Sequence, residues 1–287
     1  MKQKSLLTQT QTLMRRAGLR ARKELGQNFL VDEDVLGKII SASELTSDDV
    51  VLEVGPGLGV LTEELSKKAG LVIAVELDES ITNFLKNRFS GRKNVTSINE
   101  DILKTDVADL LLRFKATSYK VVANLPYYIT SPVLRLFLEA KIKPGSMVVM
   151  VQKEVAEEIT AKPGKMSLLS IGVQVYGKPE IISQVPATSF YPVPKVDSAI
   201  LKIMPYSEPP ITITDTKGFF TLVRAGFSQA RKQLANPLSH GLEISKDEAL
   251  ALLAKSGIDS KRRAESLSIA EWERLREAYE TWNKDKA

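Results

Sequence analysis

Short apolar runs alternate with amphipathic stretches through the first 150 residues of the chain. Five runs have the length of buried strands, at residues 50–54, 71–75, 95–98, 119–123 and 147–151. Apolar residues at helical spacing predict helices over residues 34–43, 60–68, 80–89 and 132–140. Strands that alternate with helices of about ten residues indicate a parallel, doubly wound sheet, which is a Rossmann-like α/β fold. Ligands of such sheets bind at the carboxyl ends of the strands.

The pattern changes after residue 203. Residues 204–210 are rich in proline and form a candidate linker, and the chain beyond them is helical in pattern, over residues 219–235, 246–255 and 269–284. We therefore expect three parts, which are a flexible basic arm over residues 1–24, an α/β domain over residues 25–204, and a small all-helical domain over residues 205–287.

The composition removes several classes of chemistry. The sequence has no Cys, which excludes disulfides, thiolate metal ligands and cysteine nucleophiles. Its single histidine, His240, leaves little room for a His-based metal centre or a Ser-His-Asp triad, so we expect no metal. No apolar run approaches the ~20 residues that cross a bilayer. We therefore expect a soluble, cytoplasmic protein that does not bind a membrane.

Basic residues are concentrated near the two ends of the chain, whose formal net charge is +5. The first 24 residues contain one acid, Glu24, and the basic residues Lys2, Lys4, Arg15, Arg16, Arg20, Arg22 and Lys23. Arg224, Arg231, Lys232 and residues 261–263 make a second group, and the two groups together favour a nucleic-acid partner. The acid-free first 23 residues also resemble a mitochondrial transit peptide, but a flexible arm is the simpler interpretation.

Three successive expected strands end in residues suited to a nucleoside cofactor. Gly55, Gly57 and Gly59 follow the first strand in a G-x-G-x-G spacing, which lets the backbone approach a ligand closely. Glu76 ends the next strand, where a carboxylate can accept both ribose hydroxyls. Asp101 follows the third strand and can accept an adenine amine. The ordered series predicts a site for S-adenosylmethionine.

The fourth expected strand runs into Asn124, Leu125, Pro126 and Tyr127. The Asn124 side-chain oxygen and the Leu125 carbonyl can both accept hydrogen bonds from one exocyclic amine. Pro126 fixes the backbone angle, and Tyr127 offers a flat face on which a nucleobase can stack. An amine held by two acceptors beside an aromatic ring predicts chemistry on a base.

Together these segments resemble the rRNA adenine N6,N6-dimethyltransferase family. Three more segments extend the resemblance over nearly the whole chain, namely LGQNFL at residues 25–30, SFYPVPKVDS at 189–198 and FSQARKQL at 227–234, the last as a basic helix. The second and third of these favour the bacterial small-subunit branch of the family.

The resemblance implies that S-adenosylmethionine is held by Gln27, Asn28, Leu30, Gly55, Gly57, Glu76, Leu77, Asp101, Ile102 and Asn124. Gln27 and Asn28 would hold its methionine end, and Asp101 with Ile102 its adenine ring. Asn124 and Leu125 would grip the target amine.

The resemblance also assigns aromatic side chains around the target base. Tyr127 would stack beneath the base, held by the loop that contains Pro126. Phe190 is either a second stacking face or a core aromatic, and we expect Tyr128 to be a packing residue.

The implied activity is methyl transfer to two adjacent adenosines in the 3′-terminal hairpin of small-subunit (16S) rRNA, during small-subunit assembly. The product would be N6,N6-dimethyladenosine, and the enzyme a monomer that acts on the 30S subunit or its precursor. We expect RNA phosphates to be contacted by Arg20, Arg22, Lys23, Arg231 and Lys232.

Three alternatives stay open. A large-subunit rRNA methyltransferase of the macrolide-resistance type would have the same catalytic loop, residues 124–127, but another target. A DNA adenine methyltransferase more often has a second proline where this chain has Leu125. A non-catalytic RNA-binding assembly factor would not need Gly55, Glu76, Asp101 and Asn124, all of which are present.

Overall fold

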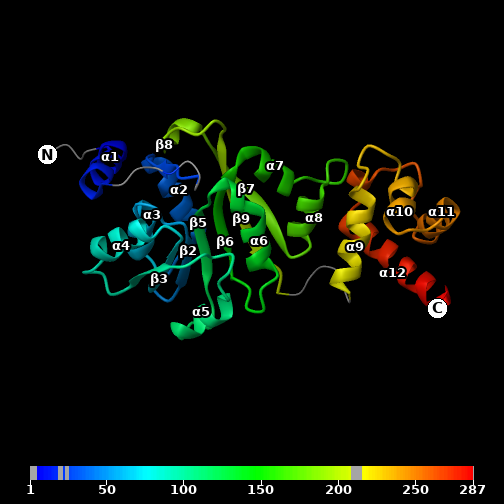
Figure 1. Cartoon of the computed structure of the whole chain (residues 1–287), viewed down its shortest axis with the longest axis horizontal. Coiled ribbons are helices and arrows are strands. Elements are labelled where there is room, and N and C mark those ends of the chain that lie inside the picture. Colours follow the sequence, from blue (N-terminus) through cyan, green and yellow to red (C-terminus); the bar gives the residue numbers. More distant parts are fainter. Residues whose placement is uncertain (1–4, 19–21, 23–25, 208–214, 287) are drawn as a thin grey trace. The chain divides into compact units, whose positions relative to one another are not determined.

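The computed structural model describes residues 5–18, 22, 26–207 and 215–286. The chain forms two compact units (Figure 1). The first unit contains residues 1–156 and 178–205, and the second contains residues 157–177 and 206–287. In the described part of the chain, no helix is long and apolar enough to cross a membrane.

The first unit is built on a seven-stranded sheet of order β4-β3-β2-β5-β6-β9-β7. Its strands are β2 (Val50–Val54), β3 (Leu71–Glu76), β4 (Val95–Asn99), β5 (Lys120–Asn124), β6 (Met147–Gln152), β7 (Gly177–Val185) and β9 (Ser198–Pro205). Strands β2 to β6 all run parallel to one another, which confirms the five expected strands. Strand β9 pairs antiparallel with β6, so the sheet is mixed, and the sequence analysis missed both β7 and β9.

The order of the strands fixes where a ligand can bind. Strand β2 lies between β3 and β5, and the chain runs outward to β3 and β4 on one side before it crosses to β5 and β6 on the other. The direction of winding therefore reverses between β2 and β5, and their carboxyl ends border a crevice. The loops that follow these two strands are residues 55–59 and residues 125–127.

The helices of this unit begin where the sequence supplies a cap. They are α1 (Leu6–Ala17), α2 (Glu33–Ser43), α3 (Val60–Ser66), α4 (Glu79–Arg88), α5 (Val107–Arg113), α6 (Thr130–Leu138) and α7 (Lys153–Ile159), whose end lies in the second unit. Asp32, Asp78 and Asp106 cap α2, α4 and α5, each accepting from the second and third N–H groups of its helix. Helices α2 and α3 share one buried cluster with strands β2 and β5.

The N-terminal arm differs from the expectation because it contains a helix. Ser5 caps α1 by accepting from the Thr8 N–H. The side chain of Thr10 is fully buried, and Leu6 packs against the core cluster of α2 and α3. A flexible arm over residues 1–24 is therefore wrong for residues 6–17, whose apolar positions recur at helical spacing.

The second unit is helical. It contains α8 (Leu168–Gln174), α9 (Thr216–Phe227), α10 (Ala235–Gly241), α11 (Lys246–Lys255) and α12 (Ile269–Lys286). Met166, which precedes α8, and Ile171, which lies within it, are buried in one cluster with Phe219 and Trp272. The N–H groups of Gly164 and Met166 also donate to the Glu265 carbonyl, at 2.9 and 3.0 Å. Residues 157–177 therefore pack with the C-terminal helices, not within an α/β domain that runs unbroken from 25 to 204.

The expected helix over residues 219–235 ends early, at Phe227. The Ser228 hydroxyl donates to the Ala225 carbonyl at 2.7 Å and competes with the helical backbone. The Leu234 N–H then bonds to the Arg262 carbonyl at 2.8 Å, not to a carbonyl of its own helix. The basic segment at residues 227–234 is therefore mostly a turn between α9 and α10, and the expectation of a basic helix was wrong.

Candidate functional site

A cavity opens at the carboxyl ends of the parallel strands of the first unit. Its walls come from five segments that are distant in sequence, residues 26–30, 53–61, 75–77, 100–103 and 124–129. All ten residues expected to hold the cofactor line this cavity, as do Leu125, Pro126 and Tyr127. The structure thus brings the two expected sites together as one.

The glycine-rich loop approaches the cavity with backbone only. Gly55 and Gly57 have φ values of +65° and +55°, a region that side chains rarely adopt. A Cβ atom on Gly57 would lie 3.1 Å from the Phe29 ring, and one on Gly55 would meet Pro126 at 3.5 Å. The loop therefore packs closely against the 26–30 segment and the catalytic loop, with no space to spare for side chains.

Two buried carboxyl groups stand behind this loop. Glu76 is only 7% exposed, and its carboxylate accepts from the N–H groups of Gly57 (3.3 Å) and Asp78 (3.0 Å). Burial raises the pKa of Glu76. Burial also raises the pKa of Glu53 to about 8, and the nearby Glu76 adds to that rise. Glu53 lines the cavity, and its Oε2 atom has no hydrogen-bond partner among the described residues.

A third wall combines apolar surface with one carboxylate. Asp101 accepts from the Leu103 N–H at 3.0 Å, which fixes the turn after β4. Ile102 and Leu30 are buried at 5% exposure each, and Leu77 is half exposed at the rim. A carboxylate that can take an amine beside flat apolar surface suits an adenine ring.

Asn124 is oriented by the segment across the cavity. Its side-chain Nδ2 donates to the Asn28 backbone carbonyl at 3.1 Å, so Oδ1 is the atom left to accept from a ligand. Asn28 in turn donates to the Gly26 carbonyl at 3.2 Å. Gln27 holds the same segment from the other side, because its Oε1 accepts from the Arg22 N–H at 2.8 Å.

The catalytic loop is anchored on both sides of Pro126. The Leu125 N–H donates to the Met150 carbonyl at 3.2 Å, which continues the pairing of β5 with β6. The Tyr127 hydroxyl bonds to the hydroxyl of Ser198 in β9 at 2.7 Å. Burial raises the pKa of Tyr127, so the hydroxyl stays protonated at neutral pH. The antiparallel strand missed in the sequence therefore supports the expected stacking residue.

Phe190 lies elsewhere. It begins β8 (Phe190–Tyr191), which pairs antiparallel with β1 (Phe29–Leu30). Its side chain is 1% exposed, belongs to the core cluster of α2 and α3, and does not line the cavity. Phe190 is therefore a core aromatic in this structure, and the expectation that it is a catalytic stacking residue is corrected.

Tyr128 was misjudged as a packing residue. It is 56% exposed and lines the cavity between Gly26 and Pro126. Partial burial raises its pKa, and the charges of Asp101 and Glu76 add to the rise. Its position after the catalytic loop, beside another tyrosine, was the available hint.

The expected RNA contacts fall into different environments. Arg22 forms an ion pair with Asp78 at 3.3 Å, and Asp78 is nearly buried at the start of α4. Arg22 therefore fastens the 26–28 segment to the rim of the cavity and is not a free cation. Arg20 and Lys23 lie outside the described residues.

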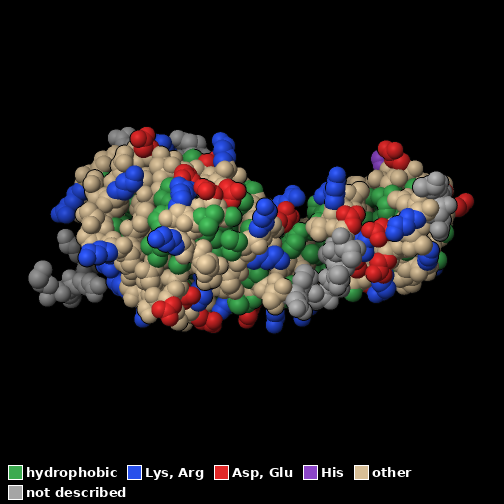
Figure 2. All heavy atoms as spheres, turned by 90° about the horizontal axis from the view of Figure 1, so that it is seen from below, with side chains coloured by type: hydrophobic (Ala, Val, Ile, Leu, Met, Phe, Trp, Pro, Cys, Tyr) green, Lys and Arg blue, Asp and Glu red, His purple; other side chains and the backbone are tan. Residues whose placement is uncertain are grey.

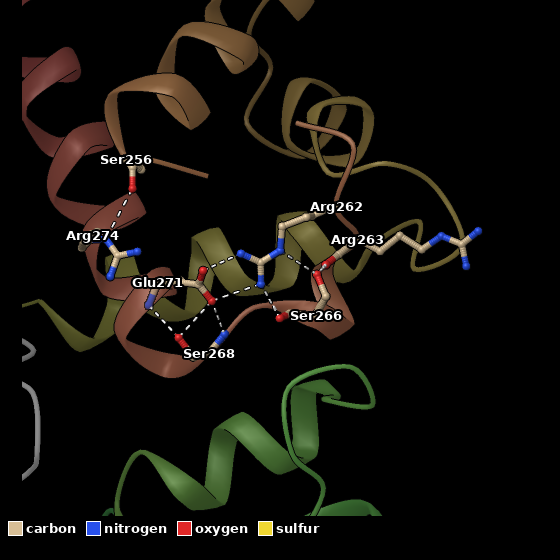
Figure 3. A network of polar contacts seen from close by, with 7 residues as sticks. All are labelled: Ser256, Arg262, Arg263, Ser266, Ser268, Glu271 and Arg274. Carbon is tan, nitrogen blue, oxygen red and sulfur yellow. Dashed lines mark hydrogen bonds and ion pairs between the residues drawn. The ribbon is translucent and has the colours of Figure 1, made fainter. Parts of the chain in front are cut away.

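In the second unit, the run of residues 261–263 divides into different roles (Figure 3). Arg262 forms an ion pair with Glu271 and also donates to the Ser266 hydroxyl at 3.1 Å. Arg262 lowers the pKa of Glu271 to about 2. Arg263 extends away from this network. Arg231 and Lys232 are exposed in the turn after α9, which the Leu234–Arg262 backbone bond places beside this run.

The cavity fits S-adenosylmethionine on its own features. Gly55 and Gly57 line it without side chains, so a ligand can lie close to the backbone there. Glu76 offers a carboxylate toward ribose hydroxyls, Asp101 toward an adenine amine, and Glu53 an orphaned carboxyl oxygen.

Comparisons with known proteins agree with this geometry. Residues 18–281 match the family described as ribosomal RNA adenine dimethylase. The chain is 54% identical over 274 residues to ribosomal RNA small subunit methyltransferase A of Dehalococcoides mccartyi (strain CBDB1), covering 94% of this chain and 92% of that protein. The protein of the same name from Bacillus cereus (strain Q1) is 43% identical over 276 residues, covering 94% of each chain.

Solved structures resemble the chain over most of its length. A dimethyladenosine transferase from Plasmodium falciparum superposes with a TM-score of 0.74 at 27% identity, covering 89% of this chain and 98% of that one. The 23S rRNA methyltransferase ErmE gives a TM-score of 0.70 at 28% identity, covering 88% and 100%. The sheet order, the cavity and the matched sequence together place this chain in the ribosomal RNA adenine dimethylase family of S-adenosylmethionine-dependent rRNA methyltransferases.

Proposed function

We propose that this protein dimethylates the exocyclic amines of two adjacent adenosines in the 3′-terminal hairpin of small-subunit rRNA. The observation that carries the chemistry is the orientation of Asn124, whose Nδ2 is committed to the Asn28 carbonyl. We propose small-subunit rRNA as the substrate because relatives at 40–54% identity are named ribosomal RNA small subunit methyltransferase A. ErmE, named for 23S rRNA, is only 28% identical.

The chain's own residues activate and hold the target amine. An adenine amine is a poor nucleophile because its lone pair is delocalised into the ring. Asn124 Oδ1 and the Leu125 carbonyl accept its two N–H groups, which favours a more tetrahedral nitrogen and frees the lone pair for attack. S-adenosylmethionine, when bound, supplies a methyl group that its sulfonium already activates. Catalysis by the protein is then positioning and electrostatics, without a strong base.

Tyr127 supports the target base. Its hydroxyl is fixed by Ser198, which restricts the ring without using its faces. A base stacked on this ring must leave its own stack, which costs a few kcal/mol in a duplex and less in a loop. Stacking on a tyrosine of limited freedom offsets part of that cost.

Two successive methylations require that the monomethylated amine can still bind in the site. Attack by the lone pair would release S-adenosylhomocysteine and leave the nitrogen positively charged until it loses one proton to water. The neutral product keeps one N–H, so only one of the two acceptors, Asn124 or Leu125, can be satisfied. The monomethylated amine must therefore rotate and bind again with its methyl group in the cavity.

We assign the contacts with RNA phosphates to individual exposed basic residues, because the face drawn in Figure 2 is not uniformly basic. Basic and acidic side chains are interspersed on the face drawn in Figure 2. In the second unit we assign phosphate contacts to the exposed Arg231 and Lys232, and to Arg263, whose ion pair with Glu265 is long (3.9 Å) and has an exposed partner. The Leu234–Arg262 bond places these residues on neighbouring segments. In the first unit Arg15 and Arg16 end α1 and are exposed. We withdraw Arg22 from this group because Asp78 holds it.

The phosphate assignment is tested by salt dependence. Replacing Arg231 and Lys232 by Gln should weaken binding to small subunits and lower the slope of log K against log salt by about 1 to 2. Lys284→Gln in α12 is the matched control and should leave the slope unchanged. An unchanged slope in the double variant contradicts the assignment.

The site of methylation is tested by mapping. Small subunits that lack adenine dimethylation are incubated with the protein and S-adenosylmethionine, and reverse transcription is then run across the 3′ end of the rRNA. Stops at two adjacent adenosines of the terminal hairpin support the proposal, and an absence of stops there contradicts it. Because the relatives are bacterial and the substrate is ribosomal, we place this activity in the cytoplasm, carried out by a monomer during subunit assembly.

A further inference from the structure

The glycine-rich loop is supported from behind by the end of helix α4. Arg88, the last residue of α4, donates from Nη1 to the carbonyl oxygen of Leu58, and Leu58 lines the cofactor cavity. The same guanidinium donates from Nη2 to Glu63 Oε2 at 2.6 Å, in the first turn of α3. One planar fork therefore joins the loop to the helix that follows it.

The support is specific for the Leu58–Gly59 peptide. The Gly59 N–H donates to the Pro56 carbonyl at 3.0 Å, while the Leu58 carbonyl accepts from Arg88. Both polar atoms of this peptide are thereby occupied, and its plane cannot turn without breaking one of the two bonds. The loop is also held at Gly55, which donates to the Val75 carbonyl at 2.9 Å, and at Gly57, which donates to Glu76.

Apolar side chains of the same helix close the space behind the loop. A Cβ atom on Gly59 would lie 2.7 Å from both Leu85 and Phe89. The Arg88 guanidinium carbon lies 5.3 Å from the centre of the Phe89 ring, which restrains the side chain that makes both polar contacts. The Arg88 side chain is 20% exposed, so solvent competes only partly for its partners.

We infer that Arg88 is a positioning residue for cofactor binding, which holds the Leu58 peptide so that the glycine-rich loop keeps the shape that receives S-adenosylmethionine. Arg88 does not line the cavity, so its effect reaches the cofactor only through the loop. Helix α4 then serves the cavity at both ends, because its cap, Asp78, donates its N–H to Glu76 and its last residue bonds to the loop.

The chain contains a matched control in Arg92. Its Nη2 lies 3.6 Å from Glu63 Oε1 and its Nη1 donates to the Ser66 hydroxyl at 3.1 Å. Arg92 thus shares the acid partner of Arg88 and lies four residues further along the chain, in the turn that follows α4. Its recorded bonds reach α3 and not the loop carbonyl.

The test measures the Kd of S-adenosylmethionine by calorimetry on the full-length protein, with KM and kcat from methyl transfer. Arg88→Gln should raise Kd and KM for the cofactor about tenfold, the worth of one charge-assisted hydrogen bond, and leave kcat at saturation within about twofold. Arg88→Lys should recover part of the affinity, since an ammonium group can bond to the carbonyl but cannot form the fork. Arg92→Gln should leave Kd unchanged.

Three results would overturn the inference. An unchanged Kd in Arg88→Gln would mean that the loop keeps its shape without the guanidinium. An equal rise in Arg92→Gln would trace the effect to Glu63 and α3. A loss of kcat at constant Kd would indicate a general loss of folded protein. If the Gln variant does not fold, the Lys variant decides by the same measurement, and a wild-type Kd there contradicts the proposal.

Discussion

Replacing Asn124 by alanine removes two contacts of unequal value. One is the Nδ2 bond to the Asn28 carbonyl, a partly buried neutral hydrogen bond worth about 1 kcal/mol. Its loss loosens the 26–28 segment and should raise the KM for S-adenosylmethionine by no more than about fivefold. The other is the Oδ1 acceptor for the target amine, which acts where charge develops in the transition state. A single positioned group of this kind contributes about 10²–10³ in kcat.

The Asn124→Ala variant should therefore lose about 10²–10³ in kcat while it still binds cofactor. Asn124→Asp separates the two contacts, because it keeps an acceptor but turns a carboxylate oxygen toward the Asn28 carbonyl. That variant should show the larger rise in cofactor KM. Single-turnover methyl transfer and calorimetry measure both quantities. A kcat for Asn124→Ala within tenfold of the wild type would refute the assignment of Asn124 as the amine acceptor.

Three further predictions follow from buried or paired groups. Because burial raises the pKa of Glu53 to about 8, the folded protein keeps its proton while the unfolded chain releases it above about pH 4.5. The free energy of unfolding should thus fall from pH 5 to pH 8 relative to Glu53→Gln in urea titrations, and parallel pH profiles would contradict the shift. Phe190→Ala should lower the free energy of unfolding by about 3–5 kcal/mol, as expected for a ring that is 1% exposed; lost turnover at unchanged stability would instead make it a stacking residue. Arg22→Gln should raise the cofactor KM several-fold without changing the salt slope of RNA binding, and a reduced slope would return Arg22 to the RNA contacts.

The sequence predicted the part of the fold that local pattern controls. Strands β2, β3, β5 and β6 are short, mainly apolar runs closed by polar or glycine residues. Each of the strands β2 to β6 was placed to within one or two residues. Since parallel strands present their carboxyl ends at one edge, the cofactor series and the 124–127 loop could be expected to meet. Strand β7 was missed because it lies at an edge of the sheet, where only its two end residues are buried, and it has no long apolar run.

The sequence could not predict features that depend on contacts between separate segments of the chain. Arg22 and Arg262 were expected to be free cations in basic runs, yet each is paired with an acid outside its run, Arg22 with Asp78 and Arg262 with Glu271. The predicted domain boundary differs from the structure for a similar reason, since Met166, Ile171 and Val175 join a buried cluster whose other members lie beyond residue 215. The sequence could not decide whether Phe190 is a core aromatic or a stacking residue, because a phenylalanine ring suits both roles and only its burial distinguishes them.

The most direct test of the account is nucleoside analysis after methyl transfer from labelled S-adenosylmethionine to small ribosomal subunits that lack adenine dimethylation. The wild-type protein should yield N6,N6-dimethyladenosine on small subunits and none on large subunits. Asn124→Ala should bind the cofactor and yield almost none. Label that appears in large-subunit rRNA, or cofactor binding by the wild type without any transfer, would contradict the proposed function.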